Sequence, residues 1–236
     1  AFFGRLSYNF KDRYFATFSL RHEGSSKFGA SNKWGSFPAV SAGWRISEEN
    51  FMKNIKWISD LKLRGDFGVT GNQEFDSYKS LALMQAYDLI YYNGSYIRGW
   101  GFSSNANPNL KWEKGKNWNV GVDFSLFNYR LSGSVNYYSR KQQDLLGNYS
   151  VALPPNGAAQ SFVNVGTMKN TGIEIDLNWN VVKNKNFDYT LGFVGSTSNN
   201  KFVSFSNNLY EGSSYYWMSS FPLYPGNPGV LQRIEE

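Results

Sequence analysis

Hydrophobic and polar residues alternate along much of the chain, most clearly on either side of a short turn at Phe127–Tyr129. In the run before this turn, apolar positions occupy one face and polar or small positions the other: Trp118, Val120, Val122, Phe124 and Leu126 against Asn119, Gly121, Asp123 and Ser125. Because successive side chains on a strand point to opposite faces, the pattern predicts a β-hairpin with one apolar and one polar face. Runs of about ten residues are long enough to cross a bilayer as tilted strands.

The same unit recurs along the chain, which predicts an all-β protein of about ten antiparallel strands. These strands are expected near residues 6–10, 14–20, 36–46, 61–70, 78–92, 96–102, 118–126, 131–137, 173–179 and 187–193. Ser47 is expected to cap one short helix, because Glu48 and Glu49 suit its positive N-terminal end. The stretch 147–160, which contains Pro154 and Pro155, is expected to be an irregular loop.

Short and long connections alternate between these strands. The turns at 11–13, 127–129 and 182–186 are short, whereas the connections at 22–33, 71–116 and 141–160 and the one that starts at 199 are long. If the strands run alternately up and down, every long connection falls on the same side, and 47–60 is the one longer segment on the turn side. Transmembrane β-barrels have this asymmetry. The sequence therefore predicts part of a transmembrane barrel wall.

Aromatic residues make up 18% of the chain, with 16 Tyr, 19 Phe and 8 Trp. Several lie beside the short turns: Phe10, Tyr14, Phe127, Tyr129, Trp179 and Phe187. Such rings are typical of the aromatic belts at a lipid–water boundary. The alternative is that they fill the core of a soluble β-protein. No run approaches the roughly 18 apolar residues of a membrane helix.

Composition narrows the chemistry that the chain can perform. Cysteine is absent and His22 is the single histidine, so thiol catalysis and a metal site with several histidines are excluded. The net charge of +6 comes from scattered Lys and Arg rather than from basic blocks, which argues against a nucleic-acid surface. Glu174 and Asp176 share a strand face, but we expect them to face a water-filled lumen rather than to act as a catalytic pair. We therefore predict no catalytic residue, no metal and no cofactor.

Four stretches resemble a known family. They are RHEGSSKFGASNKWGSFPAVSAGWRISEENF (Arg21–Phe51), LKLRGDFGVTGNQ (Leu61–Gln73), NPNLKWEKGKNWNVGVDFSLFNYRLSGSVNYYSRKQQDLL (Asn107–Leu146) and VNVGTMKNTGIEIDL (Val163–Leu177). In this order they resemble signatures of the SusC/RagA-type TonB-dependent outer-membrane transporters. His22-Glu23 departs from the pattern, where a small or apolar residue followed by Asp is expected.

The resemblance implies a barrel of about 22 strands with a plug domain in its lumen. It also implies a location in the outer membrane of a Gram-negative bacterium and import of oligosaccharides, peptides or similar large nutrients. The partners would be outer-membrane lipid, a SusD-like surface lipoprotein that acts as a lid, and the TonB complex. We expect residues 1–236 to be a fragment of one barrel domain, without the plug, the TonB box and the final strands. The missing initiating Met and the ending at Glu236, which looks cut in mid-element, favour this interpretation.

Aromatic residues in the long connections are the candidates for contact with a substrate or a lid protein: Tyr96, Trp100, Tyr215, Tyr216 and Trp217. Alternatively, these rings pack the loops together. Three other functions also stay open: a passive structural or adhesive outer-membrane barrel, an outer-membrane hydrolase, and a soluble β-sandwich or propeller.

Overall fold

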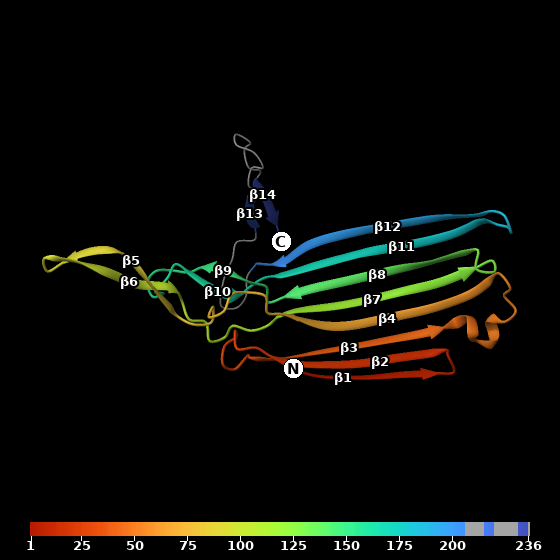
Figure 1. The fold of residues 1–236 in the computed structure, drawn as a ribbon, viewed down its shortest axis with the longest axis horizontal. Coiled ribbons are helices and arrows are strands. Elements are labelled where there is room, and N and C mark those ends of the chain that lie inside the picture. The colour runs from red at the N-terminus through yellow and green to blue at the C-terminus, as the bar shows by residue number, and fades with distance from the viewer. Residues whose placement is uncertain (206–214, 220–230, 236) are drawn as a thin grey trace.

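Antiparallel strands make up most of the computed structural model, which describes residues 1–205, 215–219 and 231–235 (Figure 1). Eight of the described strands form one sheet, in the order β1 (Phe2–Phe10), β2 (Tyr14–Gly24), β3 (Trp34–Arg45), β4 (Ile58–Asn72), β7 (Glu113–Leu126), β8 (Leu131–Gln143), β11 (Thr167–Lys183) and β12 (Asp188–Ser204). This sheet is called the wall below. Eight of the ten predicted strands lie in the wall, and the other two, near 78–92 and 96–102, pair as a separate hairpin. β12 runs five residues past Asn199, where the alternation fades in the sequence.

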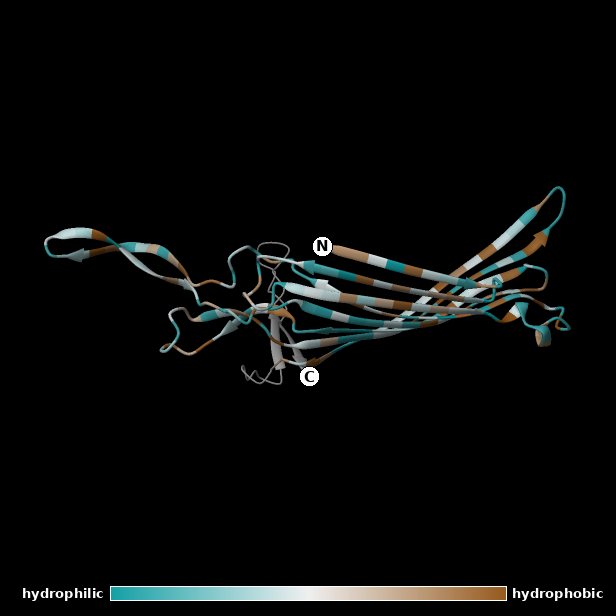
Figure 2. Cartoon of the chain, turned by 90° about the horizontal axis from the view of Figure 1, so that it is seen from below, coloured by the Kyte–Doolittle hydropathy of each residue, from teal (hydrophilic) through white to brown (hydrophobic). Residues whose placement is uncertain are grey.

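The register of the wall keeps like side chains together. Val122 on β7 pairs with Val135 on β8, and the next pair joins Asp123 to Ser134. Apolar and polar positions therefore alternate along each strand, as the striped colouring in Figure 2 shows. Pro38 pairs with β2 but precedes Ala39, the first residue that pairs with β4, so its missing N–H falls outside the β3–β4 ladder.

Short turns lie at one end of the wall and long connections at the other (Figure 1). Hairpin turns at 11–13, 127–130 and 184–187 join β1–β2, β7–β8 and β11–β12. The opposite end carries the connections between β2 and β3, β4 and β7, and β8 and β11. The predicted asymmetry of the connections is thus confirmed. We call the two ends the turn end and the loop end.

Two-stranded sheets are inserted into the long connections. They pair β5 (Leu83–Tyr92) with β6 (Ser95–Ser104), β9 (Leu146–Ser150) with β10 (Gln160–Asn164), and β13 (Tyr215–Ser219) with β14 (Leu231–Glu235). The prediction of an irregular loop at 147–160 holds for 151–159, which contain no strand or helix, but was wrong for its two ends, which pair as β9 and β10. The β5–β6 hairpin, predicted from 78, starts at Leu83 and projects well beyond the wall in Figure 1.

The predicted capped helix on the turn side was also wrong. Two 3₁₀ turns, η1 (Ile46–Glu48) and η2 (Asn50–Met52), replace it, and neither has a side-chain cap. The Ser47 hydroxyl donates instead to Asp60 Oδ1 at 2.7 Å. Glu49 interrupts the helical path with an extended backbone, φ −77° and ψ 148°. None of the helices in the described ranges is both long and apolar enough to cross a membrane.

A buried hydrophobic cluster lies in the connections of the loop end. Its centre is Phe28, Phe37, Leu110 and Trp112, with Val69, Phe75, Leu146 and Phe162 packed around it. The rings of Phe28 and Trp112 approach to 4.7 Å between centroids. Because its members come from three separate connections and the adjoining strands, the cluster fixes the loop end as one packed unit.

Candidate functional site

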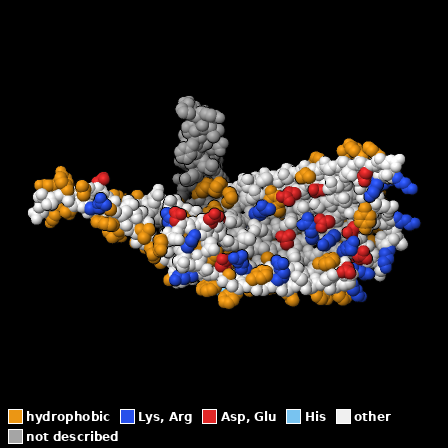
Figure 3. Space-filling model, in the orientation of Figure 1, with side chains coloured by type: hydrophobic (Ala, Val, Ile, Leu, Met, Phe, Trp, Pro, Cys, Tyr) orange, Lys and Arg blue, Asp and Glu red, His pale blue; other side chains and the backbone are white. Residues whose placement is uncertain are grey.

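Charged side chains gather on one face of the wall, which we call the polar face. Figure 3 shows Lys, Arg, Asp and Glu over the middle of the wall, with hydrophobic side chains mainly along its borders. The centre of this face holds a three-strand network. Arg64 Nε on β4 donates to both carboxylate oxygens of Asp123 on β7 at 3.0 Å, and its Nη2 donates to Asn136 on β8 at 2.6 Å. Gly121 makes the network possible, because a Cβ there would collide with Asn136 Oδ1 and crowd the guanidinium.

A polar cavity of about 400 Å³ opens on this face. Four strands supply its lining, which includes Asp66, Asn117, Asn119, Tyr138, Arg140 and Glu174. Arg140 lies over the Tyr138 ring, 5.0 Å from its centroid. The side-chain oxygen of Asn119 is buried and has no hydrogen-bond partner among the described residues. The cavity therefore offers carboxylates and a guanidinium to a polar ligand, whereas the Asn119 oxygen lies beneath its surface.

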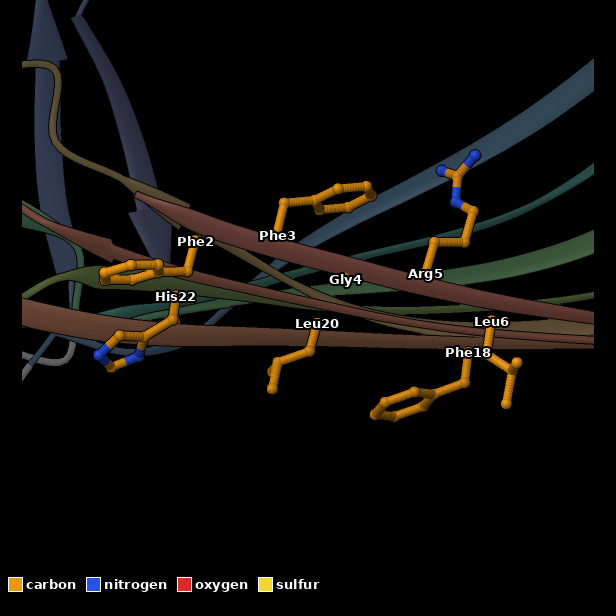
Figure 4. Close-up of a pocket in the computed structure, with 8 residues that line it drawn as sticks. All are labelled: Phe2, Phe3, Gly4, Arg5, Leu6, Phe18, Leu20 and His22. Carbon is orange, nitrogen blue, oxygen red and sulfur yellow. The ribbon is translucent and has the colours of Figure 1, made fainter.

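The opposite, apolar face exposes large hydrophobic side chains along its strands. At the β1–β2 hairpin a cleft of about 500 Å³ is lined mainly by apolar residues. Figure 4 shows Leu6, Phe18, Leu20 and His22 on one side of the hairpin, whereas Phe3 and Arg5 project to the other side. A large exposed apolar surface is costly in water and natural in contact with lipid.

His22 belongs to this apolar face and not to a catalytic site. Its ring stacks on Trp34, with centroids 4.9 Å apart, and its Nδ1 lies 2.9 Å from Ser36 Oγ. No acidic side chain in the described ranges accepts a hydrogen bond from His22. Nor do these ranges contain a group of three or more His, Cys, Asp or Glu side chains that would hold a metal ion.

Glu174 and Asp176, which share a strand face, have different surroundings. Glu174 lines the cavity, whereas Asp176 accepts a hydrogen bond from Asn178 Nδ2 at 2.8 Å. Both lie on the polar face of β11, since they pair with Asn136 and Ser134 of β8.

Aromatic side chains at the turn end are exposed, as a belt requires. Phe10, Tyr14, Phe127, Tyr129, Trp179 and Phe187 are all at least 43% accessible. Tyr14 also stacks on Trp44. Their exposure disfavours the alternative of a soluble core.

Glu49 ties the η1–η2 segment to the turn end of the wall. Its Oε1 accepts from Tyr14 Oη at 2.6 Å and from Trp44 Nε1 at 3.1 Å, and Arg13 lies 3.6 Å from Oε2. These two hydrogen bonds, aided by Arg13 and opposed by partial burial, hold the pKa of Glu49 below its usual value.

The structure places two of the predicted contact residues on the β5–β6 hairpin. Tyr96 and Trp100 are 71% and 65% exposed, and Tyr96 meets Tyr91 edge-to-face at 5.2 Å. Neither lines the polar cavity. Tyr215, Tyr216 and Trp217 are on β13, which pairs with β14, and their side chains lie outside the described residues.

Sequence reasoning missed the cavity and the loop-end cluster. The cavity arises from the lateral order of β4, β7, β8 and β11, which a single strand pattern does not contain. Phe28 was available as a signal, because it is the one large hydrophobic residue in the polar stretch HEGSSKFGASNK.

Comparisons with known proteins agree with this geometry. The family model described as TonB dependent receptor-like, beta-barrel, matches residues 1–227. The TonB-dependent receptor SusC of Bacteroides thetaiotaomicron is 35% identical over 237 residues, which cover 98% of this chain and 23% of SusC. The TonB-dependent receptor P39 of Formosa agariphila is 36% identical over 206 residues, covering 87% of this chain and 19% of P39.

The chain also superposes on solved structures. The RagAB peptide transporter superposes with a TM-score of 0.79 and 29% identity, covering 99% of this chain and 24% of that one. The RagAB peptide importer in its open-open state superposes with a TM-score of 0.80 and 29% identity, over 98% of this chain and 24% of that one. The chain thus spans about a quarter or less of the length of these relatives.

Proposed function

Since this chain belongs to the TonB-dependent receptor-like β-barrel family, in its SusC/RagA group, we propose that it forms part of the barrel wall of an outer-membrane transporter. The transporter would import nutrients such as oligosaccharides or peptides. Its relatives are receptors and transporters rather than enzymes, so the proposal contains no catalytic step.

One observation carries the proposal: 99% of this chain superposes on part of a chain of the RagAB peptide transporter. The two faces of the wall support it. Lipid would cover the exposed apolar side chains, and the charged polar face, with its cavity, would line a water-filled lumen. The aromatic rings at the turn end would then lie at the periplasmic boundary, and the long connections would face the outside.

The proposed partners follow from the same assignment. A SusD-like lipoprotein would cover the loop end, as the paired name RagAB supports for that relative. Parts of the same protein outside this chain would supply the remaining strands, a plug domain and the contact with the TonB complex. The small share of each relative that the chain covers supports this division.

Uptake measurements test the proposal. The complete gene is deleted in its host and restored on a plasmid, and cells are supplied with labelled peptides and oligosaccharides. We expect uptake of at least one of these to disappear on deletion, to return on complementation, and to stop when the proton-motive force is collapsed. Uptake that continues without the gene, or without the proton-motive force, would favour a passive structural barrel.

A further inference from the structure

We propose that the η1–η2 segment, residues 46–57, is a membrane-surface anchor that binds the headgroups of anionic phospholipids at the turn end of the wall. The inference goes beyond transport, and it rests on the membrane location in the proposed function. The segment combines a fixed position on the apolar side of the wall, two exposed aromatic rings and two lysines.

The segment is fastened to the apolar face by Glu49. This carboxylate accepts hydrogen bonds from Tyr14 Oη and from Trp44 Nε1. Tyr14 and Trp44 are partners in the β2–β3 register, and Trp44 pairs in turn with Leu63 of β4, the partner of Val122 on β7. Side chains of directly paired residues lie on the same face of a sheet. The row that holds Glu49 is therefore the row of apolar side chains that the proposed function assigns to lipid.

The neighbours of the segment in the sheet all belong to this chain. It connects β3 to β4, and β2 and β7 flank these two strands (Figure 1). A further strand of the barrel would pair with β1 or β12, at the edges of the described wall, and not beside this segment. A plug in the lumen would face the polar side. The position thus favours the bilayer surface as the neighbour of the segment on its apolar side.

Two aromatic rings of the segment are open to such a surface. Phe51 and Trp57 are 63% and 54% exposed, whereas Met52 and Ile55 between them are half-buried. The Trp57 ring lies 6.3 Å from the ring of Phe127, and the Trp57 carbonyl accepts a hydrogen bond from Phe127 N at 2.8 Å. Trp57 therefore extends the aromatic belt of the turn end. Aromatic rings at this level of a membrane lie among the lipid headgroups.

The charge of the segment selects the headgroup. Lys53 and Lys56 are exposed and lie between the two aromatic residues in the sequence. Neither makes a salt bridge with another residue of the described ranges, and the nearby Glu49 is already paired with Arg13. Figure 3 shows further Lys and Arg side chains projecting from the turn end. Each basic residue near an anionic bilayer strengthens binding to it, and a neutral headgroup lacks this attraction.

Quenching of Trp57 fluorescence tests the anchor. The complete receptor is reconstituted into phosphatidylcholine vesicles that contain a small share of either brominated phosphatidylglycerol or brominated phosphatidylcholine. Each form of the receptor is compared with the same form carrying Trp57→Phe, so that the difference reports Trp57 alone. We expect phosphatidylglycerol to bind beside Trp57 about tenfold more tightly than phosphatidylcholine, and salt at about 0.5 M to reduce this preference. In the Lys53→Gln/Lys56→Gln receptor we expect the preference to disappear.

Lys183→Gln/Lys185→Gln is the matched control. It removes two exposed charges from the same end of the wall, at the β11–β12 turn, and we expect it to keep the preference to within about twofold. A preference that disappears in this control as well would mean that the overall charge of the turn end, and not the segment, attracts the lipid. Survival of the preference without Lys53 and Lys56 would also overturn the assignment.

Two further outcomes contradict the anchor. Equal quenching by the two brominated lipids would show that the segment does not distinguish headgroup charge. Absence of quenching by either lipid would show that a periplasmic protein or another part of the receptor, rather than the bilayer, covers the segment. Because the measurement requires no transport, lost uptake with an intact lipid preference would overturn the transport proposal alone. Normal uptake without quenching of Trp57 would overturn the anchor alone.

Discussion

Arg64 extends across the backbone of Gly121, its direct partner in the β4–β7 register, and its Nε donates to both carboxylate oxygens of Asp123 at 3.0 Å. The Arg64 and Asp123 side chains are 32% and 39% exposed, so solvent screens their attraction. In a double-mutant cycle with Arg64→Ala and Asp123→Ala we expect a coupling energy of about 0.5–1 kcal/mol. Denaturant unfolding of the complete receptor in micelles measures it. A coupling energy of zero would mean that the pair does not stabilise the wall.

Neighbouring positions on β8 should respond differently to the same substitution. Val135 lies on the apolar face and Ser134 on the polar face beside Asp123. We expect Val135→Arg to cost about 2–4 kcal/mol, because it places a charge in hydrocarbon, whereas Ser134→Arg should cost far less. Folding measured in lipid vesicles compares the two variants. Equal costs would contradict the assignment of the apolar face to lipid.

Acid should release the η1–η2 segment from the wall. Hydrogen bonds from Tyr14 and Trp44 lower the pKa of Glu49 from its usual 4.5, so its charged form stabilises the folded segment. This stabilisation is complete above pH 4.5 and is lost as the pH falls through the lowered pKa. Hydrogen exchange of residues 46–57 should accelerate over that range, and Glu49→Gln should reproduce the effect at pH 7. Glu48→Gln is the control, since the single ion pair of Glu48 within the described ranges is a long one with Arg45, at 4.0 Å.

Phe28 should be essential for order at the loop end. The side chain is 2% exposed in the hydrophobic cluster, so Phe28→Ala leaves a cavity that costs about 3–5 kcal/mol. Limited proteolysis should then cut the connections around residues 25–33 and 73–112 faster, while the wall strands stay resistant. If cleavage there is unchanged, the cluster does not hold these connections.

Tyr96 and Trp100 should matter for binding and not for folding. Both are largely exposed, so Tyr96→Ala and Trp100→Ala should change the free energy of unfolding by no more than about 0.5 kcal/mol. If they contact a substrate or a lid lipoprotein, each variant should weaken that interaction several-fold in a pull-down or calorimetric titration. Wild-type affinity for both ligands in both variants would remove these residues from the site.

The alternation of apolar and polar residues predicted the strands of the wall well, because each face of the wall favours one type of residue. In a wall between lipid and a water-filled lumen, one face would favour apolar residues such as Val122 and the other polar ones such as Asp123, so the period of two is preserved over whole strands. Connection lengths independently predicted which end carries the loops. Neither signal depends on contacts between residues far apart in the sequence.

Features that depend on distant contacts were not predictable in this way. The sequence around Ser47 is typical of a helix cap, but the Ser47 hydroxyl donates a hydrogen bond to Asp60 instead. Glu49 accepts hydrogen bonds from Tyr14 and Trp44. β9 and β10 have only five residues each, too few for a visible period around a proline-rich turn. The cavity spans four neighbouring strands, with Asp66 on β4 and Glu174 on β11 at its two sides, and this lateral order is not visible in any single strand.

The length of β11 and β12 sets how much of a bilayer the proposed barrel wall would span. Each has 17 residues, so each spans about 55 Å at about 3.3 Å per residue. Tilted by about 40°, such a strand still rises about 40 Å, against a hydrocarbon core of about 30 Å. The ends of these strands would then lie within the headgroup region, which brings the bilayer to about 40–45 Å, so the long connections and not the wall itself would be the part that meets a ligand in the surrounding medium.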